Sequence, residues 1–139
     1  MITASKATNP PSPSASSLRI GSRPESVRLA RDFAARWFAA QGYDPERVAD
    51  ARLVASELVT NAHLHAAGSA EIVLRCCLCD VGAVLEVEDA GEARPVPAGN
   101  DAYATSGRGL FLVESLAAAW GTTLLADGGK AVYAVFPAP

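Results

Sequence analysis

The chain has 139 residues, of which 50% are apolar, and its 12 basic and 15 acidic residues give a net charge of -3. This length and apolar fraction suit one domain with a single packed core, and the slight negative charge argues against the basic surface that nucleic acid or an anionic membrane requires. The chain contains neither an apolar run near the roughly 20 residues that cross a bilayer nor one of signal-peptide type, so we expect a cytoplasmic protein with protein or small-molecule partners.

The N-terminal segment is rich in Ser, Pro, Ala and Thr and has no hydrophobic period. It cannot offset the entropy of ordering, so we predict a flexible tail over residues 1–17 and one folded domain over residues 18–139. Residues 18–20 are expected to form a short edge strand. Ser22 followed three residues later by Glu25 is typical of a capping box and predicts that a helix opens there. The apolar residues of this helix have helical spacing: Val27, Ala30, Phe33, Ala34 and Trp37.

A second helix is predicted from Asp44 and Pro45 to about residue 67. Aspartate caps the free amides of a helix start, and proline suits the first helical position. Gly42 would end the preceding helix. The expected buried stripe consists of Val48, Ala51, Ala55, Leu58 and Ala62. Glu57 and Asn61 lie on the flank of this stripe, where polar groups can face a cavity.

Residues 70–79 and 83–89 have strand patterns and are separated by turn residues. In the second strand, Asp89 shares a face with Leu85 and Val87, so its carboxylate is expected to be partly desolvated. The first strand carries three cysteines: Cys76, Cys77 and Cys79. Neighbouring side chains of a strand point to opposite faces, so these thiols cannot all converge on one metal and are expected to act as reduced, small apolar residues.

The last third of the sequence predicts a lid, a helix and two strands. Residues 92–106 contain two prolines and few large apolar groups, which is typical of a long binding loop. A third helix is predicted from near Gly107 to Gly121. Its apolar face consists of Leu110, Val113, Leu116 and Trp120. Strands are expected over residues 122–126 and 131–136. The whole order predicts an α+β fold, a two-layer sandwich with a mainly antiparallel sheet and three main helices on one face.

Glu57 and Asn61 are one helical turn apart and therefore share one face of the second helix. A carboxylate and a carboxamide in this arrangement can hold a hydrated Mg²⁺ and orient an attacking hydroxyl. Taken alone the pair is weak evidence, because most charged helical residues are merely solvated. The pattern therefore marks a candidate metal and catalytic site.

Two further stretches suggest a nucleotide. Asp89 could accept a hydrogen bond from the exocyclic amine of a purine, and Gly91 would let the backbone approach the base, although Asp-Ala-Gly also suits a simple turn. Gly107 and Gly109 flank Arg108 at an expected helix start, where free amides and the guanidinium attract phosphate. A flexible lid hinge explains these glycines equally well.

Together these motifs resemble the histidine-kinase-like ATPase superfamily, which has the Bergerat fold, and within it the small anti-sigma factor serine kinases of the RsbW and SpoIIAB type found in actinobacteria. The resemblance covers residues 19–137. It rests on Arg23-Pro24-Glu25-Ser26-Val27, on Ser56-Glu57-Leu58-Val59-Thr60-Asn61-Ala62 with His65-Ala66, and on Gly107-Arg108-Gly109-Leu110 through Trp120-Gly121.

The resemblance implies roles for the candidate residues. Asn61 would ligate the Mg²⁺ that bridges the ATP phosphates, and Glu57 would be the general base toward a serine hydroxyl or water. Asp89 would bind the adenine amino group, and Gly91 would line the base pocket. The phosphates would be held by three residues beneath the lid: Gly107, Arg108 and Gly109.

Two functional hypotheses follow from the resemblance. The first is a Mg·ATP-dependent serine/threonine kinase that phosphorylates an anti-anti-sigma partner of the STAS type and sequesters a sigma factor, with a homodimer implied. The second is a nucleotide-dependent binding module without phosphotransfer. Glu57 favours the first. Ala131 favours the second, because the family often has Thr or Ser after the Gly-Lys of the last hairpin, and its loss would reduce ATP affinity. A structural protein without a ligand is a further alternative.

Overall fold

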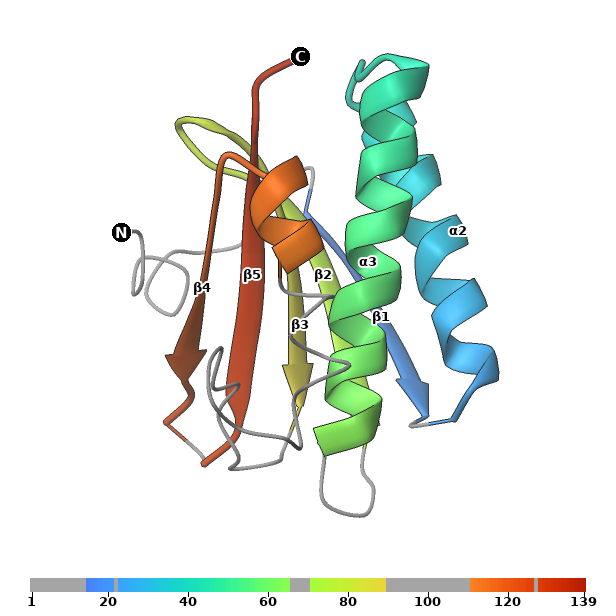
Figure 1. Cartoon of the computed structure of the whole chain (residues 1–139), viewed down its shortest axis with the longest axis vertical. Helices are drawn as coiled ribbons and strands as arrows, with labels where there is room; N and C mark the ends of the chain where they lie inside the picture. The colour runs from blue at the N-terminus through green and yellow to red at the C-terminus, as the bar shows by residue number, and fades with distance from the viewer. Residues whose placement is uncertain (1–14, 22, 66–70, 90–110, 127) are drawn as a thin grey trace.

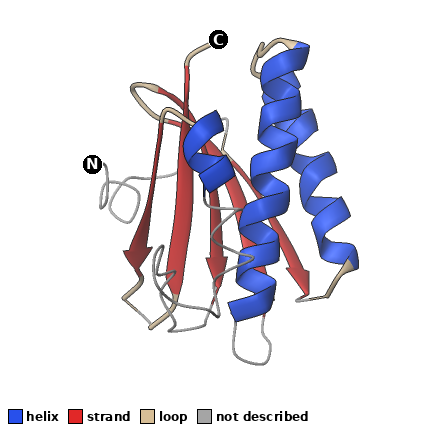
Figure 2. Ribbon diagram, viewed as in Figure 1, coloured by secondary structure: helices blue, strands red, loops and turns tan. Residues whose placement is uncertain are grey.

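The computed structural model describes residues 15–21, 23–65, 71–89, 111–126 and 128–139. Five strands form one antiparallel sheet in the order β1-β2-β3-β5-β4, and helices α2 and α3 cover one of its faces (Figure 1, Figure 2). The elements are β1 Ser16–Gly21, α2 Glu25–Ala40, α3 Pro45–His65, β2 Glu71–Leu78, β3 Gly82–Asp89, β4 Ala119–Leu124 and β5 Lys130–Pro137. The expected α+β sandwich is confirmed.

Helix α2 begins two residues later than expected. Its N-cap is Pro24, which makes no side-chain cap bond, so the predicted capping box of Ser22 and Glu25 is wrong: Glu25 is the first helical residue, and Ser22 lies outside the described part of the chain. The hydroxyl of Ser26 instead donates to the carbonyl of Gly21. Proline suits this place because its fixed φ matches the helix and its missing N–H is not needed there.

The predicted stripe of α2 faces the core. Ala30, Ala34 and Trp37 are buried, and Val27 and Phe33 pack against the core. The predicted buried stripe omitted one residue, because Phe38 is also fully buried. The ring centroid of Phe38 lies 5.3 Å from that of Trp37, 5.0 Å from that of Tyr43 and 5.1 Å from that of Phe136. This aromatic cluster joins the helix layer to β5.

The turn between the helices follows the predicted signals. Gly42 has a φ of 94°, which glycine adopts without strain, and it ends α2 as expected. Asp44 caps α3, because its Oδ1 accepts a hydrogen bond from the backbone N–H of Arg47 at 2.8 Å. Helix α3 ends at His65, within two residues of the expected end. The apolar stripe of α3 is confirmed, with Ala51, Ala55, Leu58 and Ala62 buried and Val48 packed against the core.

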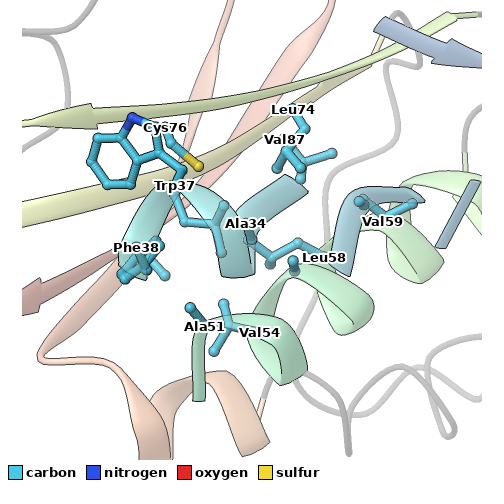
Figure 3. Close-up of a cluster of buried hydrophobic side chains, with 14 of the residues drawn as sticks. Ala34, Trp37, Phe38, Ala51, Val54, Leu58, Val59, Leu74, Cys76 and Val87 are labelled. Carbon is cyan, nitrogen blue, oxygen red and sulfur yellow. The ribbon is translucent and has the colours of Figure 1, made fainter. Parts of the chain in front are cut away.

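The core lies between the two helices and the sheet. Figure 3 shows side chains from α2, α3, β2 and β3 gathered in it. Leu74, Cys76 and Val87 alternate with residues that point to the opposite face of the sheet. Cys76 behaves as the expected apolar residue, and burial raises the pKa of its thiol. All three cysteines are free.

The third helix ends earlier than predicted. Within the described residues it covers residues 111–116 and contributes Val113 to the core. Trp120 and Gly121 were expected at the end of this helix, and that prediction is wrong because both belong to β4, where Gly121 lies opposite Tyr133 of β5. The indole of Trp120 still packs against the core. Apolar spacing over so few residues fits helix and strand alike, and pairing with β5 decides between them.

The strands of the sheet differ from the predicted ones mainly at their ends. Strand β1 begins at Ser16, inside the segment expected to be a tail. Strand β3 begins at Gly82, where an added Cβ would lie 2.1 Å from the carbonyl oxygen of Phe136. This close approach of β3 to β5 therefore requires glycine. None of the helices in the described ranges combines the length and the apolar character of a membrane span.

The face of the sheet opposite the helices carries polar side chains. Arg75 of β2 lies 3.7 Å from Glu86 and 3.5 Å from Glu88, measured from Nε to Oε1 and from Nη2 to Oε2. Tyr133 of β5 lies opposite Glu86 and is buried, and this burial raises the pKa of its phenol. The sheet therefore has an apolar face beneath the helices and a charged second face.

Tyr43 links the helix layer to the sheet. Its hydroxyl accepts the backbone N–H of Ala83 at 3.0 Å and donates to the carbonyl of Pro137 at 2.8 Å. Burial raises the pKa of this phenol, so the donor stays protonated at neutral pH. We predict that Tyr43→Phe lowers the free energy of unfolding by about 1–3 kcal/mol, because the buried N–H of Ala83 and the carbonyl of Pro137 both lose their partner.

Urea denaturation measures this loss, and Tyr133→Phe is the matched control. The Tyr133 hydroxyl is buried and has no hydrogen-bond partner among the described residues. Its removal is therefore expected to change the unfolding free energy little. Equal losses in the two variants would show that the hydroxyl of Tyr43 makes no special contribution.

Candidate functional site

Glu57 and Asn61 lie in the C-terminal half of α3, next to residues that bury the helix. Leu58 and Ala62 are 1% and 2% exposed and face the core. This packing fixes the rotation of α3, so the neighbouring positions lie along the edge of the buried stripe. Glu57 is half-buried there, whereas Asn61 is buried. The predicted placement on the flank of the stripe is confirmed.

Asn61 has an unusual environment for a buried polar residue. The residue is 5% exposed, and Oδ1 makes no hydrogen bond within the described part of the chain. A buried carbonyl oxygen without a partner costs about 1–3 kcal/mol, and such exceptions call for an explanation such as an ion, a water or a ligand. Carboxamide oxygens are among the ligands that Mg²⁺ accepts. The carboxamide oxygen of Asn61 therefore suits a hard cation such as Mg²⁺ as a ligand.

The other predicted site residue, Asp89, ends β3 on the face covered by the helices. Its carboxylate receives two hydrogen bonds from the ammonium of Lys130, at 3.1 Å to Oδ1 and 3.0 Å to Oδ2. The side chains of Asp89 and Lys130 are each 1% exposed. The expected desolvation of Asp89 is confirmed, and the buried charge is compensated by an ion pair.

Lys130 reaches Asp89 because the two residues are directly opposite in the β3–β5 ladder. Ala131 is opposite Glu88 and therefore lies on the other face of the sheet. Alanine at position 131 thus removes no contact on the face of Asp89. The effect of this alanine on ATP affinity stays a prediction.

The structure places the described candidates at one end of the molecule. Helix α3 packs against β3, and the C-terminal ends of both elements and the start of β5 lie at the lower end in Figure 1. Asp89 is the last residue of β3, Asn61 lies in the last turns of α3, and Glu57 is one turn before Asn61. The remaining candidates lie outside the described residues: Gly91, Gly107, Arg108 and Gly109.

Sequence reasoning missed the role of Lys130. No clear signal was available, because all residues of β5 from Lys130 to Phe136 are buried and do not alternate. In the structure Val132, Ala134 and Phe136 belong to the core cluster, and the same parity places Lys130 on the helix face. Its partner depends on strand register, which local patterns do not reveal. The described part of the chain contains no group of three or more His, Cys, Asp or Glu side chains that could hold a metal ion, so a cation site here would depend on the carboxamide of Asn61 and on phosphate oxygens.

Comparisons with known proteins agree with this architecture. The sequence model of the histidine kinase-like ATPase domain matches residues 20–136. A crystal structure of the RsbU and RsbW domains of Rv1364c from Mycobacterium tuberculosis is similar, with a TM-score of 0.64 and 23% sequence identity. The similarity covers 88% of this chain but only 32% of that one, so this chain spans about a third of the length of its structural relative. The search of curated proteins finds no match.

Proposed function

Because this chain belongs to the histidine kinase-like ATPase domain family, we propose that it binds Mg·ATP and transfers the γ-phosphoryl group to a serine or threonine of a partner protein. The observation that carries this proposal is the buried Asn61 carboxamide, whose Oδ1 has no hydrogen-bond partner in the described residues, one helical turn from the half-buried Glu57. Fixed polar groups of this kind are expected where a ligand completes the hydrogen bonding.

In the proposed site, Asn61 would hold the Mg²⁺ together with the ATP phosphates. The ion supplies neutralisation of the negative charge on the phosphate oxygens. Asp89 would accept a hydrogen bond from the exocyclic amine of adenine while Lys130 compensates its charge. Gly91 would line the base pocket, and Gly107, Arg108 and Gly109 would bind the phosphates.

Glu57 would act as the general base. It accepts the proton of the attacking hydroxyl, the hydroxyl oxygen forms a new bond to the γ-phosphorus, and the bond from that phosphorus to the β–γ bridging oxygen breaks to release ADP. The partial exposure of Glu57 suits this role, since a substrate hydroxyl must reach the carboxylate from outside the chain. Water at the same place would give ATP hydrolysis instead.

The proposed partners follow from the resemblance to anti-sigma factor kinases and from the RsbW domain in the structural relative. We propose an anti-anti-sigma protein of the STAS type as the phosphoryl acceptor, and a sigma factor as the protein that is sequestered. A homodimer and a cytoplasmic location belong to the same proposal. Co-purification followed by mass spectrometry would identify the two partners.

A binding module without phosphotransfer is the second candidate. Lys130 donates to both carboxylate oxygens of Asp89, which lowers the gain from an adenine amine for both candidates alike. Both candidates bind nucleotide, so the turnover of ATP distinguishes them. Nucleotide binding without ADP formation, in the presence of the co-purified partner, would support the module.

We predict that Asn61→Ala weakens Mg²⁺-dependent ATP binding by at least about tenfold, because the cation loses its protein oxygen. Isothermal titration calorimetry with ATP and ADP, each with and without Mg²⁺, measures this effect. The control is Arg52→Ala, a change on the same helix at a residue that lies 3.5 Å from Asp32, measured from Nη1 to Oδ1. Full Mg²⁺-dependent affinity in Asn61→Ala would contradict the proposed role of Asn61.

A further inference from the structure

The face of the sheet away from the helices is buried at its centre. Tyr133 and Val135 of β5 are only 6% and 2% exposed. They lie on this face because the residues that alternate with them belong to the core beneath the helices. An antiparallel sheet with helices on one side commonly leaves its other face to water. Helices α2 and α3 lie on the opposite side (Figure 1), so they do not account for this burial.

Tyr133 belongs to a row of directly opposite residues that crosses the sheet. Ser17 of β1 is opposite Arg75, which is opposite Glu86; Tyr133 lies between Glu86 and Gly121 of β4.

Two donors of this row have no hydrogen-bond acceptor among the described residues: the hydroxyl of Tyr133 and Nε of Arg75. The Arg75 nitrogen lies 3.7 Å from Oε1 of Glu86, which is too far for a hydrogen bond. Burial raises the pKa of the Tyr133 phenol, so its hydroxyl remains a donor at neutral pH. Buried donors of this kind indicate that a group with free acceptors completes the face.

We propose that the proline-rich segment preceding β1 docks across this face, with its prolines packed on the ring of Tyr133. The segment comprises residues 10–14 and contains Pro10, Pro11 and Pro13. Residues 1–14 lie outside the described part of the chain. The inference is independent of the nucleotide site, because no residue of the row takes part in that site.

The chemistry of a proline-rich segment matches what the row lacks. Proline has no N–H, so such a segment offers carbonyl acceptors with few donors of its own. Proline also favours the polyproline II conformation, which has no internal hydrogen bonds and leaves these carbonyls available. Surfaces lined by aromatic rings bind such segments because little conformational entropy is lost. Gly121 has no side chain beside Tyr133, which lets a second backbone approach the ring.

The position and the length of the segment also fit. Strand β1 begins at Ser16, which lies opposite Cys76, the neighbour of Arg75. The order β1-β2-β3-β5 gives three steps of about 4.8 Å each, or about 14 Å from β1 to β5. Polyproline II rises about 3.1 Å per residue, so roughly five residues cover this distance. Counting back from Ser16 by that length reaches Pro11.

Nuclear Overhauser spectroscopy of the isotopically labelled full chain tests this contact. Contacts are expected between the ring protons of Tyr133 and the protons of the three prolines. Their absence would overturn the inference and leave the flexible tail that composition predicts. Contacts of Tyr133 only between a labelled and an unlabelled copy would overturn it too, because a second copy would then cover the face.

A pair of variants tests whether Tyr133 holds the segment. The backbone order parameter of Ser12, measured by ¹⁵N relaxation, is expected near about 0.85 in the unaltered chain and below about 0.6 in Tyr133→Ser. Val73→Ser is the matched control, because Val73 is half-buried on the same face but outside the row, and it should keep the higher value. Equal values in Tyr133→Ser and the unaltered chain would overturn the inference.

A change in the segment itself keeps the test decisive if Tyr133→Ser does not fold. Pro10→Gly, Pro11→Gly and Pro13→Gly together leave the described domain unaltered. They are expected to shift the ring resonances of Tyr133 but not those of Tyr43, which lies on the helix side of the sheet. Unchanged Tyr133 resonances would show that the prolines do not contact the ring.

Discussion

Glu57→Gln is expected to leave ATP bound but to slow its consumption by about 100-fold to 10,000-fold, the usual contribution of a general base. Glutamine has the shape of glutamate and cannot accept the proton of the attacking hydroxyl. The side chain is half-buried, on a helix whose rotation is fixed by the buried Leu58. The proposed site binds ATP through residues other than Glu57, so the affinity for ATP should change little.

Two measurements test this expectation. Formation of ADP and transfer of labelled phosphate to the co-purified partner give the rate, and calorimetry gives the affinity for ATP. Glu46→Gln is the matched control, because Glu46 is exposed in the first turn of the same helix. Equal rates in Glu57→Gln and the unaltered chain would exclude Glu57 as the base. An unaltered chain that binds ATP but forms no ADP with its partner would favour the binding module.

Lys130→Met is expected to lower the free energy of unfolding by about 3–5 kcal/mol, which is the cost of leaving one charge of a buried pair without its partner. Both members are 1% exposed, so water cannot replace the lost ammonium around Asp89. A typical domain is stable by only about 5–15 kcal/mol, so this single change removes a large fraction of the total. Chemical denaturation of the nucleotide-free chain measures the loss.

Two further variants show whether burial is the cause. Asp89→Val combined with Lys130→Met removes both charges and should recover most of the lost stability, because apolar replacement of a buried pair is often neutral. Arg19→Met breaks the ion pair to Glu71, whose side chains are 69% and 56% exposed, and should cost less than about 1 kcal/mol. A small loss in Lys130→Met, comparable to that of Arg19→Met, would show that the buried pair contributes little to stability.

These two buried features bear on each other. Breaking the ion pair of Asp89 is expected to destabilise the nucleotide-free fold, and the unpartnered carboxamide oxygen of Asn61 is expected to lower its stability until a ligand binds. The ion pair between β3 and β5 and the unpartnered oxygen in α3 lie toward the same end of the molecule (Figure 1). A ligand that satisfies Asn61 would raise the melting temperature, since binding to the folded state alone shifts the unfolding equilibrium.

Much of the fold was accessible from local patterns. The apolar spacing in α2 and α3 predicted their buried stripes, because each turn of a helix returns side chains to the same face every three or four residues. Alternation in β3 placed Asp89 beneath the helices beside Leu85 and Val87, as the structure confirms. Glu57 and Asn61 were identified together for the same reason, since a separation of four residues fixes their relative direction.

Errors arose where a short segment had two possible structures. Residues 119–121 have too few apolar positions to separate helix from strand, and hydrogen bonding to β5 selected the strand. At the start of α2, the spacing of Ser22 and Glu25 suggested a cap, yet Pro24 already provides the backbone geometry of a helix start. In both cases a neighbouring residue or strand outweighed the local preference.

Periodicity and residue chemistry in the chain were thus sufficient for the two layers, for the faces of the helices and for the polar candidates on them. The tertiary structure decided which residues those candidates contact. Asp89 and Lys130 are 41 residues apart in the chain, and only the register between β3 and β5 places them opposite each other. The missing partner of the Asn61 oxygen is likewise a property of the packed interior, because long-range burial decides which polar atoms lose water and which gain a new contact.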